Sequence, residues 1–204
     1  MVERQLRGRD ISNPRVLQAM AEIPRHRFVS AGSQRDAYAD HPLPIGHGQT
    51  ISQPYIVALM TQLLQPQPAD RVLEIGTGCG YQTAVLARLV QQVWTVEIVP
   101  ALAQRAQATL AGLGCANVVF RTGDGRCGWP EGGPFDGIVV TAAPAGLPEL
   151  LAGQLADGGR LVIPLGGRFA QVLHRFVRHG ARLESEELIS VRFVPLVGPP
   201  PAPP

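Results

Sequence analysis

A cluster of glycines behind an acidic residue is the first feature of the sequence that could do chemistry. Gly76, Thr77, Gly78 and Gly80 follow Glu74 in the run Val-Leu-Glu-Ile-Gly-Thr-Gly-Cys-Gly-Tyr. Glycines let the backbone turn sharply and approach a ligand without an intervening Cβ. The dinucleotide pattern GxGxxG needs a third glycine at position 81, where this chain has tyrosine. An acidic residue before the glycines instead suits a ligand with an ammonium group, which Glu74 could bind directly or through water.

Two further acidic residues follow later predicted strands. Glu97 ends the second one, where a carboxylate can accept two hydrogen bonds from a ribose diol. Asp124, followed by Gly125, comes after the third and could accept a hydrogen bond from an adenine amino group. A solvated charge and an ordinary Asp-Gly turn are the respective alternatives. Together the three acidic strand ends predict a ligand with cationic, diol and amino parts, and S-adenosylmethionine has all three.

The composition excludes several other kinds of chemistry. All 18 basic residues are arginine, so the chain lacks the lysine of a Walker-type phosphate loop or of a Schiff base. The three cysteines and five histidines show no zinc-ligand spacing, and we expect no metal. The net charge of +2 is too small to predict a nucleic-acid partner.

The distribution of apolar residues bears on location. No apolar run approaches the ~18 residues that span a bilayer. Residues 1–10 are charged and do not form an apolar signal region. We therefore expect no membrane partner and a cytoplasmic location, where cysteines stay reduced.

Strand and helix patterns alternate from residue 70 onward, and these elements must position the acidic residues. We expect helices at residues 81–90 and 100–114, and five strands at 71–75, 93–97, 118–121, 135–141 and 160–164. Such alternation predicts a parallel sheet with helices on both faces, whose ligands bind at the carboxyl ends of the strands. Residues 171–177 and 182–194 indicate an antiparallel pair at the carboxyl-terminal edge. The expected fold class is α/β, a doubly wound, mostly parallel, Rossmann-like sheet with helices on both faces.

The first 53 residues differ in composition from the rest and are expected to form a cap of helices and loops. Asn13 and Pro14 are typical of a helix start, and that helix should end at Pro24. Residues 36–53 are rich in glycine, proline and polar residues, which predicts a long ordered loop. A second helix should begin at Pro54.

The domain organisation follows from the distribution of these elements. We expect one domain over residues 1–198 that includes the cap, because no second core is evident. Residues 199–204 are rich in proline and predict an extended tail.

Several segments resemble known methyltransferases. The acidic-x-Gly-x-Gly-x-Gly pattern resembles motif I of S-adenosylmethionine methyltransferases. Residues 43–55, Leu-Pro-Ile-Gly-His-Gly-Gln-Thr-Ile-Ser-Gln-Pro-Tyr, closely resemble the signature of protein-L-isoaspartate O-methyltransferases. Residues 140–144 (Val-Thr-Ala-Ala-Pro) and 191–196 (Val-Arg-Phe-Val-Pro-Leu) are similar to the same family. The resemblance covers about residues 13–198, in the order of the family.

The resemblance implies roles for the first of these segments. Ser52 would be the active-site residue, and Gln49, Thr50 and Ile51 would lie beside the methyl donor. A serine just before Pro54 could instead cap a helix.

The other two segments would complete the site. Thr141 would contact the donor where the methyl group is handed over. Val194, Pro195 and Leu196 would form with Ser52 a peptide-binding edge, whose backbone groups hold the isoaspartyl unit. Threonine also simply suits a strand, and apolar residues suit a strand end.

The reaction implied is methyl transfer from S-adenosylmethionine to the free carboxylate of L-isoaspartyl residues in damaged proteins and peptides. It leaves S-adenosyl-L-homocysteine and initiates repair through a succinimide. Two other functions stay open at this point: methylation of RNA or of a small molecule, and a non-catalytic module that binds the donor. The arginines among residues 1–35 could indicate RNA, but acidic residues are mixed among them, which favours an ordinary solvated surface.

Overall fold

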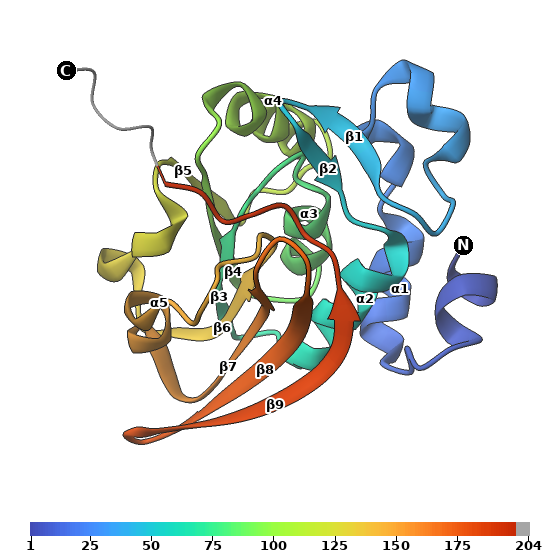
Figure 1. The fold of residues 1–204 in the computed structure, drawn as a ribbon. Helices are drawn as coiled ribbons and strands as arrows, with labels where there is room; N and C mark the ends of the chain where they lie inside the picture. Colours follow the sequence, from blue (N-terminus) through green and yellow to red (C-terminus); the bar gives the residue numbers. More distant parts are fainter. Residues whose placement is uncertain (199–204) are drawn as a thin grey trace.

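A seven-stranded sheet forms the core of the structure, a computed structural model that describes residues 1–198 (Figure 1). The strand order is β5-β4-β3-β6-β7-β8-β9. Neighbours from β5 to β7 are parallel, whereas β8 and β9 pair antiparallel at one edge. The strands are Arg71–Ile75 (β3), Gln92–Glu97 (β4), Val118–Thr122 (β5), Phe135–Val140 (β6), Leu155–Gly166 (β7), Gln171–His179 (β8) and Arg182–Val191 (β9).

The strand order reverses at β3, which has β4 on one side and β6 on the other. Ile75, the last residue of β3, pairs with Val96 of β4 and with Val140 of β6. The next residue of each chain segment is therefore Gly76, Glu97 or Thr141. The register alone brings these three residues to one edge, at the switch point where open α/β sheets bind ligands.

Helices cover both faces of the sheet, as predicted. Residues that alternate along a strand face opposite sides, so Val72 packs in the hydrophobic cluster of α1 to α4, whereas Leu73 packs in the cluster of α5. Asn13 Oδ1 accepts hydrogen bonds from the first turn of α1, which confirms the predicted cap. The helices are Pro14–Glu22 (α1), Pro54–Leu64 (α2), Tyr81–Ala87 (α3), Pro100–Ala111 (α4) and Glu149–Gly153 (α5).

The prediction of a loop at residues 36–53 is wrong in part, because this segment contains an antiparallel hairpin. Its strands are Leu43–Gly46 (β1) and Gln49–Ile51 (β2), which lie next to α4 in Figure 1. Both turn residues have positive φ, 55° at His47 and 70° at Gly48, as in a type I′ hairpin. Arg105 of α4 donates to Ile45 O at 2.6 Å and ties the hairpin to the body of the protein.

Several predicted boundaries also differ from the structure. The strand expected at 160–164 belongs to the longer β7, and the last strand ends at Val191 and not at residue 194. The helices expected at 81–90 and 100–114 end at Ala87 and Ala111. The short helix α5 was not predicted, and the proline-rich tail lies outside the described residues.

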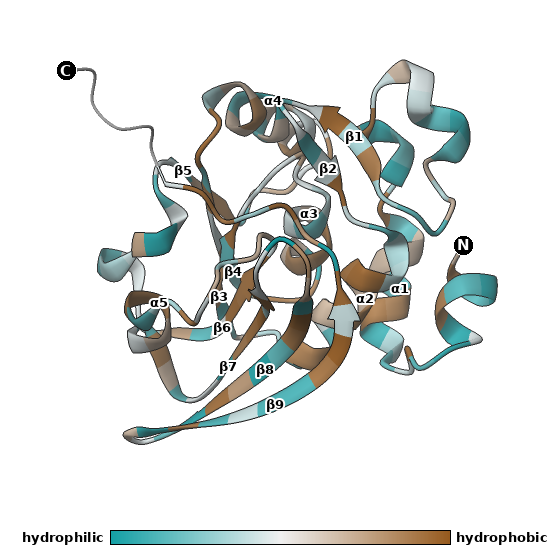
Figure 2. Cartoon of the chain, viewed as in Figure 1, coloured by the Kyte–Doolittle hydropathy of each residue, from teal (hydrophilic) through white to brown (hydrophobic). Residues whose placement is uncertain are grey.

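Hydropathy varies along the long β8–β9 edge (Figure 2). The first half of β9 is hydrophilic and exposed, whereas Leu188 and Ile189 near its end pack against the main core. Among residues 1–198, no helix has the length and apolar character that crossing a membrane requires.

Candidate active site

The glycine-rich turn connects β3 to α3 at the switch point. Gly76, Gly78 and Gly80 have φ values of 94°, 56° and 89°, which residues with side chains rarely adopt. A Cβ at Gly76 would collide with Thr141 Oγ1, and one at Gly80 would lie 3.0 Å from Leu110 of α4. The absence of a side chain at Gly76 therefore leaves space for Thr141 at the edge where ligands bind. The absence of one at Gly80 lets α3 pack against α4.

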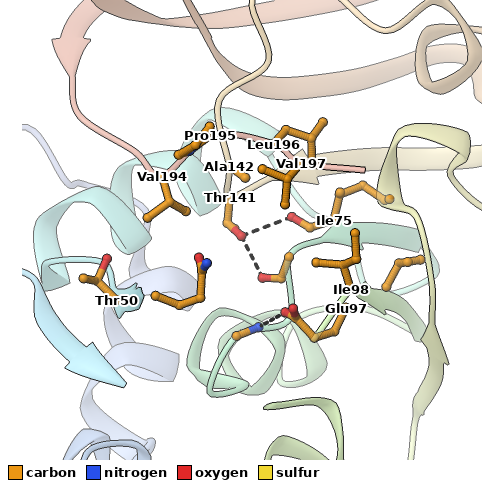
Figure 3. Close-up of a pocket in the computed structure, with 15 residues that line it drawn as sticks. Thr50, Ile75, Glu97, Ile98, Thr141, Ala142, Val194, Pro195, Leu196 and Val197 are labelled. Atoms are coloured by element: carbon orange, nitrogen blue, oxygen red, sulfur yellow. Dashed lines mark hydrogen bonds between the residues drawn. The ribbon is translucent and has the colours of Figure 1, made fainter. Parts of the chain in front are cut away.

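The turn borders an open cleft, which we call the central cleft (Figure 3). Strand ends, the β1–β2 hairpin and the segment after β9 all contribute to its walls. Figure 3 shows Val194 to Val197 on one side of the cleft, across from Glu97 and Ile98. The predicted residues that line it are Gln49, Thr50, Gly76, Gly78, Glu97, Gly125, Thr141, Val194, Pro195 and Leu196.

Glu97 brings a carboxylate to the central cleft. It is 5% exposed, and its Oε2 accepts from Gly78 N at 2.7 Å (Figure 3). Its Oε1 accepts from Val99 N at 2.9 Å. Each carboxylate oxygen has a second lone pair. The side chain is thus fixed by the backbone and keeps capacity to accept hydrogen bonds from a diol.

Thr141 joins the ends of β3 and β6. Its Oγ1 lies 3.1 Å from Ile75 O and 2.7 Å from Gly76 O, and its amide donates to Ile75 O at 2.9 Å (Figure 3). The hydroxyl fills the space that a side chain at position 76 would take. Thr141 therefore holds the start of the glycine turn as well as lining the cleft.

Glu74 lies beneath the turn and not in the cleft. It is fully buried, and its Oε2 accepts from Thr83 Oγ1 (2.5 Å) and Thr95 Oγ1 (2.6 Å). Thr95 Oγ1 is also 2.6 Å from Thr77 Oγ1, so hydroxyl groups connect Glu74 to the turn. Burial raises the pKa of Glu74 to about 8. In this structure Glu74 supports the turn through these hydroxyl groups and its Oε1 has no partner among residues 1–198, while its predicted contact with a ligand ammonium, direct or through water, stays a prediction.

Asp124 is engaged with its neighbour Arg126. The Arg126 guanidinium contacts both carboxylate oxygens, at 2.7–3.0 Å, and its hydrogen bonds hold the pKa of Asp124 below the usual range. Asp124 Oδ1 also accepts from Arg126 N and caps the short helix Gly125–Cys127 (η4). Gly125 lines the central cleft, whereas Asp124 does not. The adenine contact of Asp124 stays a prediction, and in this structure Gly125 is the residue of this turn that borders the cleft.

Ser52 lies where two further cavities meet. An inner pocket is lined by Ile51, Ser52 and Thr77 among others, and a side cavity of about 620 Å³ is lined by Ser52 and the segment 190–194. Thr50 and Thr141 border the central cleft, the inner pocket and the side cavity. A ligand in the cleft and another in the side cavity would therefore meet at Thr50 and Thr141, next to Ser52.

The alternative that Ser52 caps a helix is not supported. The N-cap of α2 is Gln53, and no side chain makes a capping hydrogen bond there. Within residues 1–198, no group is hydrogen-bonded to Ser52 Oγ, so the hydroxyl is available to a ligand.

More residues of the segment 194–196, which follows β9, line the central cleft than line the side cavity. Ala143 N donates to Val194 O at 2.8 Å, and Leu196 N donates to Ala143 O at 2.9 Å. Pro195 and Leu196 line the central cleft, whereas Val194 lines both the cleft and the side cavity. Of the three residues predicted at a peptide-binding edge, Val194 alone reaches the side cavity, and two of the backbone groups are already paired.

Some residues that line the cavities were not singled out from the sequence. Ile98 lines the central cleft, Gln82 and Met60 line the inner pocket, and Ile56 and Arg192 line the side cavity. The sequence could have indicated two of them as site residues. Ile98 follows Glu97 directly, and Arg192 lies inside the segment 191–196. The other three lie on helices, where the sequence pattern indicates only an apolar or a polar face.

Comparison with known proteins decides between the functions that the sequence left open. A model of the protein-L-isoaspartate(D-aspartate) O-methyltransferase family matches residues 1–200. The chain belongs to this family. The membership confirms the predicted function, protein-L-isoaspartate O-methylation, and the predicted enzyme class, S-adenosylmethionine-dependent protein carboxyl methyltransferase.

Relatives named protein-L-isoaspartate O-methyltransferase match over almost the whole chain. The relative from Methanoregula boonei is 57% identical over 198 residues, 97% of this chain and 91% of its own length. The relative from Picosynechococcus sp. is 53% identical over 200 residues, which cover 97% of this chain and 89% of the relative.

Two solved structures show the same architecture. A structure of a protein-L-isoaspartate O-methyltransferase aligns with a TM-score of 0.88 and 31% identity, over 97% of this chain and 66% of that one. A family structure from Plasmodium falciparum, in complex with S-adenosyl-L-homocysteine, aligns with a TM-score of 0.83 and 27% identity, over 96% of each chain. These likenesses confirm the predicted Rossmann-like fold.

The residues of the central cleft fit the methyl donor of this family. Gly76 and Gly78 present backbone without side chains, and Glu97 keeps lone pairs for ribose hydroxyls. Ile98 and Leu196 supply apolar walls of the kind that a purine ring packs against. When bound, S-adenosylmethionine supplies an electrophilic methyl group.

Proposed function

We propose that methyl transfer takes place where the central cleft meets the side cavity. S-adenosylmethionine binds in the cleft, and the L-isoaspartyl carboxylate of a damaged protein or peptide enters through the cavity. The observation that carries this proposal is the shared wall: Thr50 and Thr141 border all three spaces, and Ser52 borders the inner pocket and the side cavity.

The donor-binding residues have distinct roles in this proposal. Glu97 accepts hydrogen bonds from the ribose hydroxyls. Gly76 and Gly78 let the donor approach the backbone closely. Residues 49–51 form the wall beside the methionine part of the donor. Asp124 acts indirectly, because it caps η4 and so positions Gly125.

The charge of the side cavity suits an anionic substrate. Among the described residues that line it, Arg192 is the charged one, and no acidic side chain is present. Ile56, Phe193 and Val194 also line the cavity, and such apolar side chains can contact peptides that differ in sequence. We further propose that the substrate is a flexible segment, since isoaspartyl residues form in turns and loops.

The chemistry requires little proton transfer. A carboxylate, with a pKa near ~4, is already an anion at neutral pH. One carboxylate oxygen forms a bond to the methyl carbon while the carbon–sulfur bond breaks, and a neutral thioether leaves. Ser52 Oγ donates a hydrogen bond to the carboxylate and orients it, so that catalysis comes from alignment and from exclusion of water.

The product then changes without help from the protein. The nitrogen of the following peptide bond attacks the methyl ester carbonyl, a carbon–nitrogen bond forms, and methanol leaves with the proton of that nitrogen. The succinimide that results can open to a normal aspartyl residue.

Two peptides of the same sequence test the proposed substrate. They differ only in whether one aspartyl residue is joined to the next residue through its side-chain carboxyl or through its backbone carboxyl. With methyl-labelled S-adenosylmethionine, the isoaspartyl peptide is expected to be labelled at least about 100-fold faster than its aspartyl twin, because only its carboxylate can reach the shared wall. Labelled ester and released methanol are counted over time. Equal labelling of the two peptides contradicts the proposal.

The compartment is part of the same proposal. All three cysteines, Cys79, Cys115 and Cys127, are free thiols, which suits the reducing cytoplasm. Burial raises the pKa of Cys79 to about 11, so this thiol of the glycine turn stays protonated and unreactive. Fractionation of cells tests the location.

A further inference from the structure

Arg25 is a completely buried charged residue for which the proposed mechanism has no role. It begins the short helix Arg25–Phe28 (η2), directly after Pro24, and its exposed fraction is 0%. Its Nε donates to Ala37 O at 2.7 Å, and its Nη2 donates to Ser52 O at 2.7 Å. Removing a charged group from water is unfavourable. The groups that contact Arg25 compensate part of this cost, and they therefore indicate the role of the residue.

The same guanidinium contacts the donor side of the site. Its Cζ lies 4.7 Å from the centre of the Tyr81 ring, and Tyr81 directly follows Gly80 of the glycine turn. Phe28 packs against the same ring edge to face, with 5.4 Å between ring centres. Arg25 thus connects Ser52 with the start of α3, two parts of the site that are distant in sequence.

Among residues 1–198, no acidic side chain forms an ion pair with Arg25. Asp40, an acidic neighbour, pairs instead with Arg9 at 3.0 Å and accepts from Tyr55 N at 3.1 Å. Arg25 Nη1 has no hydrogen-bond partner among residues 1–198. A buried arginine is usually compensated by a carboxylate. Here the two hydrogen bonds go to backbone carbonyls, and one of these belongs to the residue at the shared wall.

We propose that Arg25 is a positioning residue for methyl transfer, which fixes the Ser52 backbone relative to the glycine turn. The inference rests on the proposed role of Ser52. A displacement of about 1 Å can reduce an alignment-dependent rate by about 100-fold. Arg25 touches neither Glu97 nor Thr141, so donor binding depends on it much less than turnover does.

Arg25→Lys tests this inference. Lysine keeps the positive charge but lacks the rigid fork that reaches two carbonyls at once. We expect kcat for the isoaspartyl peptide to fall about 10-fold or more, with the donor Kd changed less than about twofold. Arg25→Gln, which buries no charge and can still donate to one carbonyl, should give the same pattern if the lysine variant does not fold.

Arg15→Lys is the matched control. Arg15 also donates to two backbone carbonyls, Pro66 O at 2.8 Å and Leu89 O at 2.5 Å, but it lies outside the cleft, the inner pocket and the side cavity. We expect this variant to lose stability comparable to Arg25→Lys while kcat stays within about twofold. An equal fall in kcat in both variants would show general destabilisation and overturn the inference.

A double-mutant cycle shows whether Arg25 acts through Ser52. Ser52→Ala alone should lower kcat, and Arg25→Lys should lower it little further in that background. If the two effects multiply instead, Arg25 does not act through Ser52.

Hydrogen exchange provides a readout that needs no substrate. Arg25→Lys should speed exchange of the amides in residues 51–53 about 10-fold or more, and Arg15→Lys should not. Unchanged exchange in this segment overturns the inference about Arg25. Faster exchange, together with no isoaspartyl methylation by the unaltered protein, would instead reject the proposed substrate and leave the link between Arg25 and Ser52 intact.

Discussion

Glu74 and Glu97 show how far residue types alone lead. Both lie at or near the carboxyl end of a strand, and both were predicted to contact the donor. Glu97 follows the last pair of the β3–β4 register and reaches the cleft, whereas Glu74 is one residue before the strand end and points into the core. Its partners Thr83 and Thr95 come from other elements, so no spacing in the sequence could have identified them.

The buried Glu74 predicts a pH-dependent stability. Its pKa is about 8 in the folded protein and near its ordinary value of 4.5 in the unfolded chain. Between these values the folded state retains a proton that the unfolded state releases. The free energy of unfolding should therefore fall as the pH rises through this range, by about 1.4 kcal/mol per pH unit from this group.

Glu74→Gln removes this titration and serves as the comparison. Urea unfolding at pH 5, 6, 7 and 8 should show that the difference in stability between wild type and variant shifts in favour of the variant as the pH rises. A difference that is constant across this range would mean that Glu74 is ionised in the folded protein.

At the scale of elements, the β1–β2 hairpin is the main feature that sequence patterns missed. Its strands are short, and proline, glycine and histidine among them obscure the alternation of Leu43, Ile45 and Ile51, which are buried. The His47-Gly48 turn was the available signal, although histidine is less typical of a left-handed position than asparagine. The short central strands β3, β4 and β6 were predicted well because most of their buried residues are apolar.

The left-handed conformation of His47 leads to a prediction about the hairpin. His47→Val should destabilise the protein by about 1–2 kcal/mol, because a β-branched residue is strained at a positive φ. His47 is exposed, so little packing is lost. Chemical denaturation measures the change.

His47→Asn is the matched control for the hairpin, because asparagine tolerates this conformation. We expect its stability to stay within about 0.5 kcal/mol of the wild type. Equal losses in the two variants would attribute the effect to the imidazole ring and not to backbone strain.

At the scale of the whole molecule, the fold places an acidic residue and a basic residue in two neighbouring spaces. The carboxylate of Glu97 borders the cleft that we propose for the donor, and Arg192 lines the cavity that we propose for the anionic substrate. The sequence predicted the acidic wall from strand ends. The basic wall depends on how β9 lies against α2 at the edge of the sheet, which a local pattern does not reveal.

Arg192→Gln should weaken substrate binding. Because Arg192 is exposed, we expect the KM for an isoaspartyl peptide to rise about two- to fivefold at low salt, with kcat little changed. The rise should shrink as the ionic strength increases, since salt screens such pairs. Steady-state kinetics at several salt concentrations measure both effects.

Arg168→Gln controls for the loss of one charge. Arg168 is exposed and lies outside the lining of the side cavity. It should leave the KM and its salt dependence as in the wild type. The same KM in both variants would place the substrate away from Arg192.

The segment 194–197 forms one side of the cleft, opposite walls built from residues 75–98. A ribosome releases those walls about a hundred residues before it releases this segment. A nascent chain that has already formed β3 and β4 thus still lacks one side of its donor cleft. Methylating capacity should consequently arise only after residues 194–197 have left the ribosome and Leu196 has docked on Ala143.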